Sequence, residues 1–172
     1  RIVFGEDFVD SHAVVTSLVN CNSPLVWDQT MLDALKVYAR ANQAVLCSPF
    51  MLAGASTAAS TAGSVAQLNA EALAGIAFGQ LLRPGSPMVH GSAVFGVSMT
   101  SGGPIVGTPE LAHVNLMIGQ LARRYRIPWR SSASWSGAKL VDAQAGYETI
   151  MTMFPVVASG ANWVAHSAGF ID

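Results

Sequence analysis

The feature that most constrains the fold is a regular alternation of short apolar segments with longer helix-like segments. Five strand-length apolar segments, most of them rich in β-branched or aromatic residues, begin at Ala13, Ala44, Met88, Pro128 and Asn162. Four segments with helical periodicity separate them. This order predicts a mixed α/β fold in which a parallel sheet is wrapped by helices.

The first two helical segments have recognisable boundaries. The first is expected to begin near Thr30, with Thr30 as its N-cap and Asp33 three residues on, and to end around Asn42. The second should run from about Ser64 to Leu82. It is dominated by Ala and Gly, so we expect it to lie close against the sheet.

The third and fourth helical segments also begin with typical capping residues. Thr108 is the expected N-cap of the third, with Pro109 at its first position and Glu110 in its first turn. The fourth is expected to start at Asp142. Its 3.6-residue period predicts one buried apolar face, made of Ala143, Tyr147, Ile150, Phe154 and Val157.

Doubly wound sheets and (β/α)8 TIM barrels both satisfy this alternation. The sequence has no GxGxxG after the first strand and no Walker motif, which disfavours a nucleotide-binding sheet. A TIM barrel needs eight strands and about 250 residues. We therefore expect residues 1–172 to be a single segment of a barrel domain, with about five strands and four helices, the remaining strands being absent from the chain.

The composition agrees with a partial domain. Charged residues make up 11% of the chain, against about 25% in an ordinary soluble domain, and the mean hydropathy is +0.41. The first residue is Arg1 where a complete gene product would begin with Met. Much of the surface should therefore be covered by other protein, and we expect homo-oligomerisation.

Charge and hydropathy also restrict the partners and the compartment. A net charge of -1 gives no electrostatic case for nucleic acid or an anionic membrane. The sequence has no uninterrupted apolar run long enough to span a bilayer, and no basic start of a signal peptide. The two cysteines, Cys21 and Cys47, are too few for a disulfide framework and are expected to be buried or loop thiols. A cytoplasmic location is predicted.

Polar side chains follow each predicted strand, where parallel α/β folds place their sites. These candidates are Asn20 and Asn22, Cys47 and Ser48, His90 and Ser92, Ser131 and Ser132, and His166 and Ser167. A histidine in an apolar strand is more often a core residue than a functional one. The sequence shows neither HExxH nor paired CxxC, so no metal site is predicted in this chain.

Three further features have both a structural and a functional reading. The stretch DAQAGYE, residues 142–148, is a good helix start, but it also lies in a loop on the expected catalytic face. The loop TSGGPIVGTPE is either a plain turn or an anion site at a helix N-terminus. Aromatic side chains near loops are either core residues or faces for a quaternary ammonium group: Trp27, Trp129, Trp135, Trp163, Phe50 and Phe95.

Several long strings resemble one family. LCSPFMLAGASTAASTAGSVAQLNAEALAGI, RPGSPMVHG, GTPELAHVNLMIGQLARRY, DAQAGYE and ANWVAHSAG occur in the expected order, and the resemblance runs from about Asn20 to the last residue. Together they are similar to the trimethylamine methyltransferase family, whose members are longer (β/α)8 barrels. The resemblance implies methyl transfer from an N-methylated amine to cob(I)alamin, a form of cobalamin carried by a partner corrinoid protein.

The resemblance also implies a substrate class and site residues. Archaeal trimethylamine enzymes of the family carry pyrrolysine, and no nonstandard residue is present here, so a quaternary amine is preferred over a tertiary one. The predicted catalytic residues are His166 and Asp142. The predicted substrate-binding residues are His90, Gln144, Glu148, Asn22, Ser48 and Ser132. Two alternatives stay open: a barrel that binds a methylated amine without catalysis, and an inactive fragment of the longer enzyme.

Overall fold

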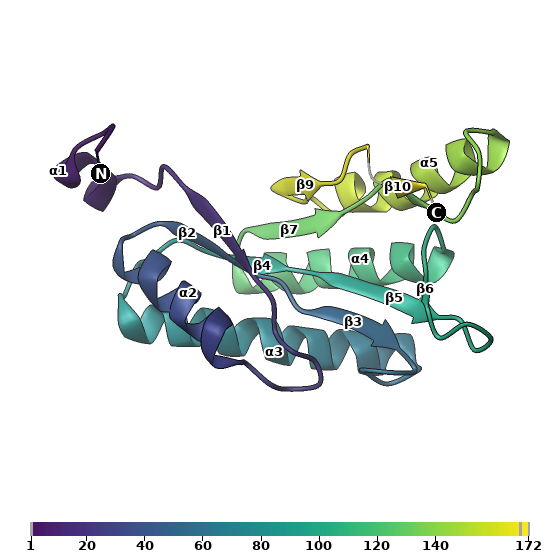
Figure 1. The fold of residues 1–172 in the computed structure, drawn as a ribbon, viewed down its shortest axis with the longest axis horizontal. Coiled ribbons are helices and arrows are strands. Elements are labelled where there is room, and N and C mark those ends of the chain that lie inside the picture. Colours follow the sequence, from purple (N-terminus) through teal and green to yellow (C-terminus); the bar gives the residue numbers. More distant parts are fainter. Residues whose placement is uncertain (1, 169, 172) are drawn as a thin grey trace.

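The computed structural model describes residues 2–168 and 170–171, and its centre is a curled, five-stranded parallel sheet (Figure 1). The strands are β1 (Thr16–Val19), β2 (Ala44–Cys47), β4 (Met88–Gly91), β7 (Trp129–Ser132) and β9 (Trp163–Ala165), and they are neighbours in this order. Every neighbouring pair is parallel. The sheet therefore confirms the predicted strands and forms half of a barrel, as expected for part of a TIM-barrel fold.

Helix α1 (Glu6–Ser11) precedes the first strand, and four longer helices connect the strands of the barrel sheet. These are α2 (Gln29–Arg40), α3 (Thr61–Leu82), α4 (Pro109–Tyr125) and α5 (Ala143–Ala158). The predicted caps Thr108 and Asp142 occupy their N-cap positions. The expected start of the first long helix was wrong by two residues, because the side chain of Asp28 accepts a hydrogen bond from the Met31 N–H and caps α2 ahead of Thr30. Helix α1 was not predicted.

A second set of short strands prolongs the sheet beyond the carboxyl ends of the barrel strands. β3 (Phe50–Ala53) follows β2 after two residues, and β5 (Ala93–Val97) follows β4 after one. They pair in parallel, and β6 (Pro104–Ile105) joins β5. β8 (Trp135–Ser136) and β10 (Phe170–Ile171) form a similar pair after β7 and β9. These extensions surround the carboxyl ends of the barrel strands, where sites are expected.

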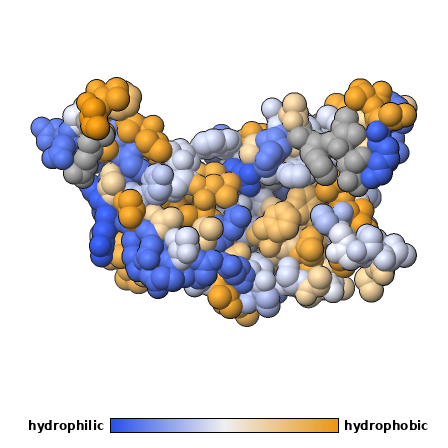
Figure 2. All heavy atoms as spheres, in the orientation of Figure 1, coloured by the Kyte–Doolittle hydropathy of each residue, from blue (hydrophilic) through white to orange (hydrophobic). Residues whose placement is uncertain are grey.

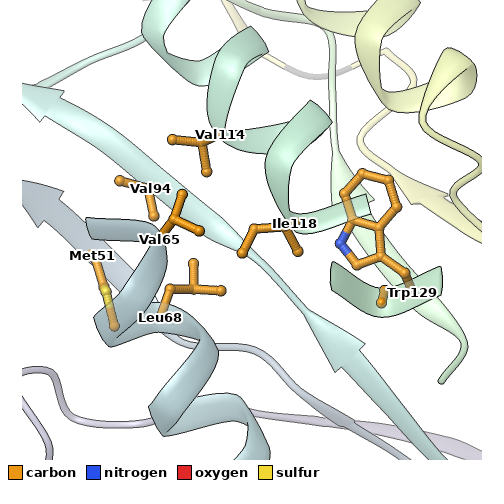
Figure 3. Close-up of a cluster of buried hydrophobic side chains, with 8 residues drawn as sticks. Met51, Val65, Leu68, Val94, Val114, Ile118 and Trp129 are labelled. Carbon is orange, nitrogen blue, oxygen red and sulfur yellow. The ribbon is translucent and has the colours of Figure 1, made fainter. Parts of the chain in front are cut away.

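The core lies between the sheet and the helices. One cluster joins α3, α4, β3, β5 and β7, with Met51, Val65, Leu68, Val94, Val114, Ile118, Ala122 and Trp129 all at most 5% exposed (Figure 3). In the described residues the α3 helix approaches the sheet as closely as its small side chains suggested. A Cβ added to Gly75 would lie 2.5 Å from Cζ2 of the rigid Trp27 ring and 3.0 Å from Cys47 Sγ of β2, so the close contact needs glycine there.

The predicted buried face of α5 is wrong. Tyr147, Ile150, Phe154 and Val157 are 60 to 78% exposed, and Ala143 is also exposed. The helix packs through its other side, where Ala145, Thr152, Pro155 and Val156 are buried. Leu81 of α3 is also exposed. None of the described residues covers the large apolar side chains of α5.

On the side of the molecule that Figure 1 shows, hydrophobic surface lies near the middle of the view (Figure 2). Half-exposed apolar side chains of β1 and β3, Leu18 and Phe50, contribute to the interior of the open half-barrel. In the described part of the chain, no helix combines the length and apolarity needed to cross a membrane.

Candidate functional site

A pocket of about 450 Å³ lies inside the half-barrel at the carboxyl ends of its strands. The side chains that line it come from β1, β7 and β9, from residues that directly follow β1, β2 and β9, and from the strand extensions. They are Leu18, Asn20, Ser48, Phe50, Ala93, Phe95, Arg130, Ser132, Trp135, Ala165 and His166. Three predicted site residues, Ser48, Ser132 and His166, are thus brought together from three different strands. This end of the strands is where TIM barrels place their active sites.

One wall of the pocket is a continuous chain of aromatic rings. The ring centroids of Phe50 and Phe95 are 5.4 Å apart, those of Phe95 and Trp135 are 5.3 Å apart, and Trp135 meets the imidazole of His166 edge-on at 4.8 Å. Strand alternation explains the wall. In β3 and β5 the neighbouring Met51 and Val94 point into the core, so Phe50 and Phe95 point toward the pocket.

The pocket also contains a buried charged side chain, Arg130, which the sequence analysis did not single out. It is 4% exposed and its Nη1 donates a hydrogen bond to Ser48 Oγ at 3.1 Å. Its Nε has no hydrogen-bond partner in the described structure. Burial lowers the pKa of Arg130. Alternation in the strand WRSS was the available signal, because Trp129 and Ser131 face the helices and leave Arg130 and Ser132 facing inward.

His166 lies at the exposed mouth of the pocket. Its Nδ1 is 3.1 Å from Ser132 Oγ, and its backbone has the left-handed φ of 58°. Such a conformation is unusual for a residue other than glycine and is enriched at functional sites. Burial and the positive charge of Arg130 lower the pKa of His166, which favours the neutral imidazole, the form that can accept a hydrogen bond.

Two other predicted site residues lie outside this pocket. His90 belongs to β4 but faces the helix layer, where it is fully buried and its Nε2 lies 3.3 Å from Asn69 Oδ1 of α3. Burial lowers the pKa of His90 to about 4. Asn22 forms a bridge with Val26 in the loop after β1 and does not line the pocket, whereas the neighbouring Asn20 does.

The DAQAGYE residues form a separate polar cluster. Asp142 Oδ1 accepts the N–H of Ala145 at 3.1 Å and so caps α5. Glu148 Oε2 accepts Ser136 Oγ and the N–H of Gly137, both at 2.8 Å, and Gln144 Nε2 donates to Glu148 Oε1 at 2.9 Å. Although partial burial opposes it, these hydrogen bonds lower the pKa of Glu148.

Gln144 and Glu148 line a second hollow of about 590 Å³, together with Gly107, Thr108 and Pro109 of the glycine-rich loop. Ser136 and Gly137 directly follow Trp135 of the aromatic wall, so Glu148 holds the segment that leads away from that wall. The cluster thus supports the pocket from outside, and its carboxylates do not line it.

A buried carboxylate that sequence reasoning missed organises the loop after β1. Glu71 of α3 is 2% exposed, and it accepts hydrogen bonds from Ser23 Oγ at 2.6 Å, the N–H of Leu25 at 2.7 Å and Gln67 Nε2 at 2.9 Å. These bonds hold its pKa below the usual range although burial acts in the opposite direction. The loop leads from Asn20 at the pocket to α2, so Glu71 fixes its course.

The two cysteines are further reactive side chains, and they lie outside the pocket. Cys21 and Cys47 are buried free thiols, as predicted, and burial raises the pKa of each to about 12. Among the described residues, no three or more His, Cys, Asp or Glu side chains are grouped so that they could hold a metal ion.

Comparison with known proteins places these features in a family. The family model described as trimethylamine methyltransferase (MTTB) matches residues 1–172. A glycine betaine methyltransferase of Desulfitobacterium hafniense (strain Y51) is 42% identical over 168 residues, which are 98% of this chain and 35% of that protein. A trimethylamine methyltransferase MttB of Methanosarcina thermophila is 34% identical over 160 residues, which are 92% of this chain and 33% of that protein.

The chain therefore spans about a third of the length of these relatives. The match of the family model over the full sequence, together with the half-barrel, shows that the chain belongs to the trimethylamine methyltransferase (MTTB) family.

Proposed function

We propose that this chain is part of a corrinoid-dependent methyltransferase that takes a methyl group from a quaternary N-methylated amine. The observation that carries the proposal is the aromatic wall of Phe50, Phe95 and Trp135 in a pocket at the carboxyl ends of the barrel strands. The acceptor is cob(I)alamin on a partner corrinoid protein, as the family resemblance implies. The 42% identity to a glycine betaine methyltransferase supports a quaternary rather than a tertiary amine.

The wall suits a quaternary ammonium group for a physical reason. Such a cation has no N–H to donate, so hydrogen-bond acceptors cannot hold it. Aromatic faces attract it through their quadrupoles, and one contact contributes about 0.5 to 2 kcal/mol as the site becomes drier. Phe95 is 3% exposed and Phe50 is 45% exposed, so the wall runs from the interior to the solvent.

The chemistry asked of this chain is to bind and orient the amine. Transfer breaks one C–N bond, leaves its electron pair on nitrogen as a neutral tertiary amine, and gives the methyl carbon a bond to the nucleophilic acceptor. The protein must hold that C–N bond in line with the acceptor. No proton has to move to a quaternary nitrogen, so an apolar wall suffices around it.

The predicted site residues divide into three groups within this proposal. Ser48, Ser132 and His166 line the pocket, which supports a role at the substrate. Asp142, Gln144 and Glu148 cap α5 and hold the segment after Trp135, which supports a positioning role. His90 and Asn22 make no pocket contact in the described structure, so the substrate-binding role predicted for them has no support from it.

The wider setting is also part of the proposal. Residues 1–172 would be one segment of a TIM-barrel domain whose other strands complete the pocket, and the exposed apolar face of α5 supports burial against further protein, including a second subunit. A cytoplasmic location is supported by the two free thiols. The corrinoid protein would meet the open mouth beside His166 and Phe50.

The test uses the full-length gene product with its corrinoid protein in the cob(I)alamin state. Trimethylamine, glycine betaine, carnitine and choline are supplied in turn, and loss of cob(I)alamin is followed by absorbance. Transfer from at least one quaternary amine, and none from trimethylamine, is expected. Binding without transfer from any of them would refute catalysis and favour the non-catalytic binding barrel.

A further inference from the structure

The pocket holds a buried positive charge that has no partner of opposite sign among the described residues. None of the described residues lining the pocket or the smaller hollow beside it is acidic, and Arg130 lines both. Two ion pairs between described residues, Lys36 with Asp33 and Arg83 with Asp10, lie elsewhere. A buried, unpaired guanidinium is costly because its hydration is lost without a compensating anion.

The hydrogen bonds of Arg130 are also incomplete. A guanidinium has five N–H donors in a planar fork, and here Nη1 reaches Ser48 Oγ while the buried Nε has no partner. An Nε–H together with an η-NH₂ matches the two oxygens of a carboxylate. The unpaired donor therefore indicates the chemistry of the missing ligand.

Arg130 lies at the floor of the pocket, away from its mouth at His166. The hollow below contains side chains from earlier on the strands, Thr16 to Leu18 and Leu46, whereas the pocket above contains the strand extensions. Arg130 lies where the two meet. Ser132 is about 6.6 Å further along the same strand, at 3.3 Å per residue, and it leads to Trp135 of the wall.

We propose that Arg130 binds the carboxylate of a zwitterionic substrate whose quaternary ammonium group lies against Phe50, Phe95 and Trp135. This inference rests on the proposed function and narrows its substrate class to betaines, in which one short molecule carries both charges. The carboxylate held at the floor directs the N-methyl groups to the mouth, where the acceptor arrives. Arg130 is thereby the specificity-determining residue.

The test compares two probes that share a trimethylammonium group. Glycine betaine carries a carboxylate and choline carries a hydroxyl in its place. Their affinities for the full-length gene product are measured by calorimetry without any acceptor. The wild type is expected to prefer glycine betaine. Arg130→Gln should lower the affinity for glycine betaine by roughly 10- to 100-fold, the usual effect of losing a charge-assisted hydrogen bond. The affinity for choline should stay nearly unchanged.

Two further variants sharpen the result. Arg124→Gln removes an exposed arginine of α4 and should alter neither affinity, which controls for net charge. Ser48→Ala removes the hydroxyl that accepts a hydrogen bond from Arg130 Nη1. It should lower the affinity for glycine betaine but not for choline, and by a smaller factor than Arg130→Gln does. If Arg130→Gln does not fold, the selective loss in Ser48→Ala supports the inference, and an unselective loss or no loss overturns it.

Other outcomes separate this inference from the proposed function. Equal loss of both affinities in Arg130→Gln, a wild type that does not distinguish the probes, or binding of neither probe overturns the role of Arg130. Methyl transfer from choline as fast as from glycine betaine overturns it too, while the methyltransferase function stands. Selective, Arg130-dependent binding with no transfer to cob(I)alamin supports the role of Arg130 and refutes the catalytic function.

Discussion

Gly91 connects the packing of the sheet to the pocket, and replacing it with alanine should damage both. A Cβ added to Gly91 would lie 2.5 Å from Ser48 Cβ and 2.7 Å from Ser48 Cα. Ordinary contact begins at 3.4 Å, so Ser48 would have to retreat by about 0.9 Å. Part of the obstacle is backbone, which cannot rotate away as a flexible side chain would. Overpacking of this kind costs about 1 to 3 kcal/mol.

The displaced residue is also the hydrogen-bond partner of Arg130. Ser48 Oγ accepts Arg130 Nη1 at 3.1 Å, and a retreat of this size would take the pair beyond hydrogen-bond distance. Gly91→Ala should therefore lower the free energy of unfolding by about 1 to 3 kcal/mol and also weaken substrate binding. Urea denaturation and calorimetry on the same preparation of the full-length protein measure both effects.

Gly146 provides the matched control. It lies on the exposed side of α5, and an added Cβ would meet nothing within 4 Å. Gly146→Ala should stabilise the protein by about 0.5 to 1 kcal/mol, because alanine is the better helix former, and leave binding unchanged. If Gly91→Ala is as well tolerated as Gly146→Ala, then β4 does not approach Ser48 as closely as the structure shows and the reasoning fails.

Three other side chains give predictions of their own. Burial lowers the pKa of His90 from 6.5 to about 4, so on acidification the unfolded chain binds this proton before the folded chain does. The protein should therefore lose up to about 3 kcal/mol of stability as the pH falls from about 6.5 toward 4. The difference in unfolding free energy between wild type and His90→Gln, measured over that pH range, checks this. Glu148→Gln should increase amide hydrogen exchange at Gly137, whose N–H it accepts; unchanged exchange would contradict its positioning role. His166 has a left-handed φ of 58°, which asparagine tolerates better than alanine, so the free energy of unfolding of His166→Asn should exceed that of His166→Ala by about 1 kcal/mol. Both variants lose the imidazole and should slow methyl transfer equally. Unequal slowing would show that backbone strain matters more than the ring.

The sheet was predictable from sequence because each strand is a short apolar run bounded by turns and helices. The five barrel strands occur where those runs were found, and the caps Thr108 and Asp142 are in place. The buried face of α5 was not predictable in the same way. Periodicity shows that Tyr147, Ile150 and Phe154 share a face, but not whether this segment of chain covers it.

The site was only partly predictable, since the position of a residue after a strand does not tell which way its side chain points. Ser48, Ser132 and His166 point into the pocket, whereas His90, equally close to a strand end, points to the helices and Asn69. Arg130 was overlooked because a charged residue is ordinarily taken as exposed. Alternation with Trp129, a large side chain that belongs in the core, was the evidence that would have turned Arg130 inward.

The same alternation explains why the pocket wall can be rigid. In β3 and β5, Met51 and Val94 are locked in the core beneath α3 and α4, and the intervening residues on the other face are Phe50 and Phe95. The backbone of such a strand cannot move without dislodging its buried residues, so core packing fixes the positions from which the aromatic rings project. A cation–π site needs this, because a quaternary ammonium group offers no directional hydrogen bond to select one arrangement from many. The strand extensions beyond the barrel thus hold the wall in place, and in the proposed complex the guanidinium of Arg130 below it would supply a directional contact.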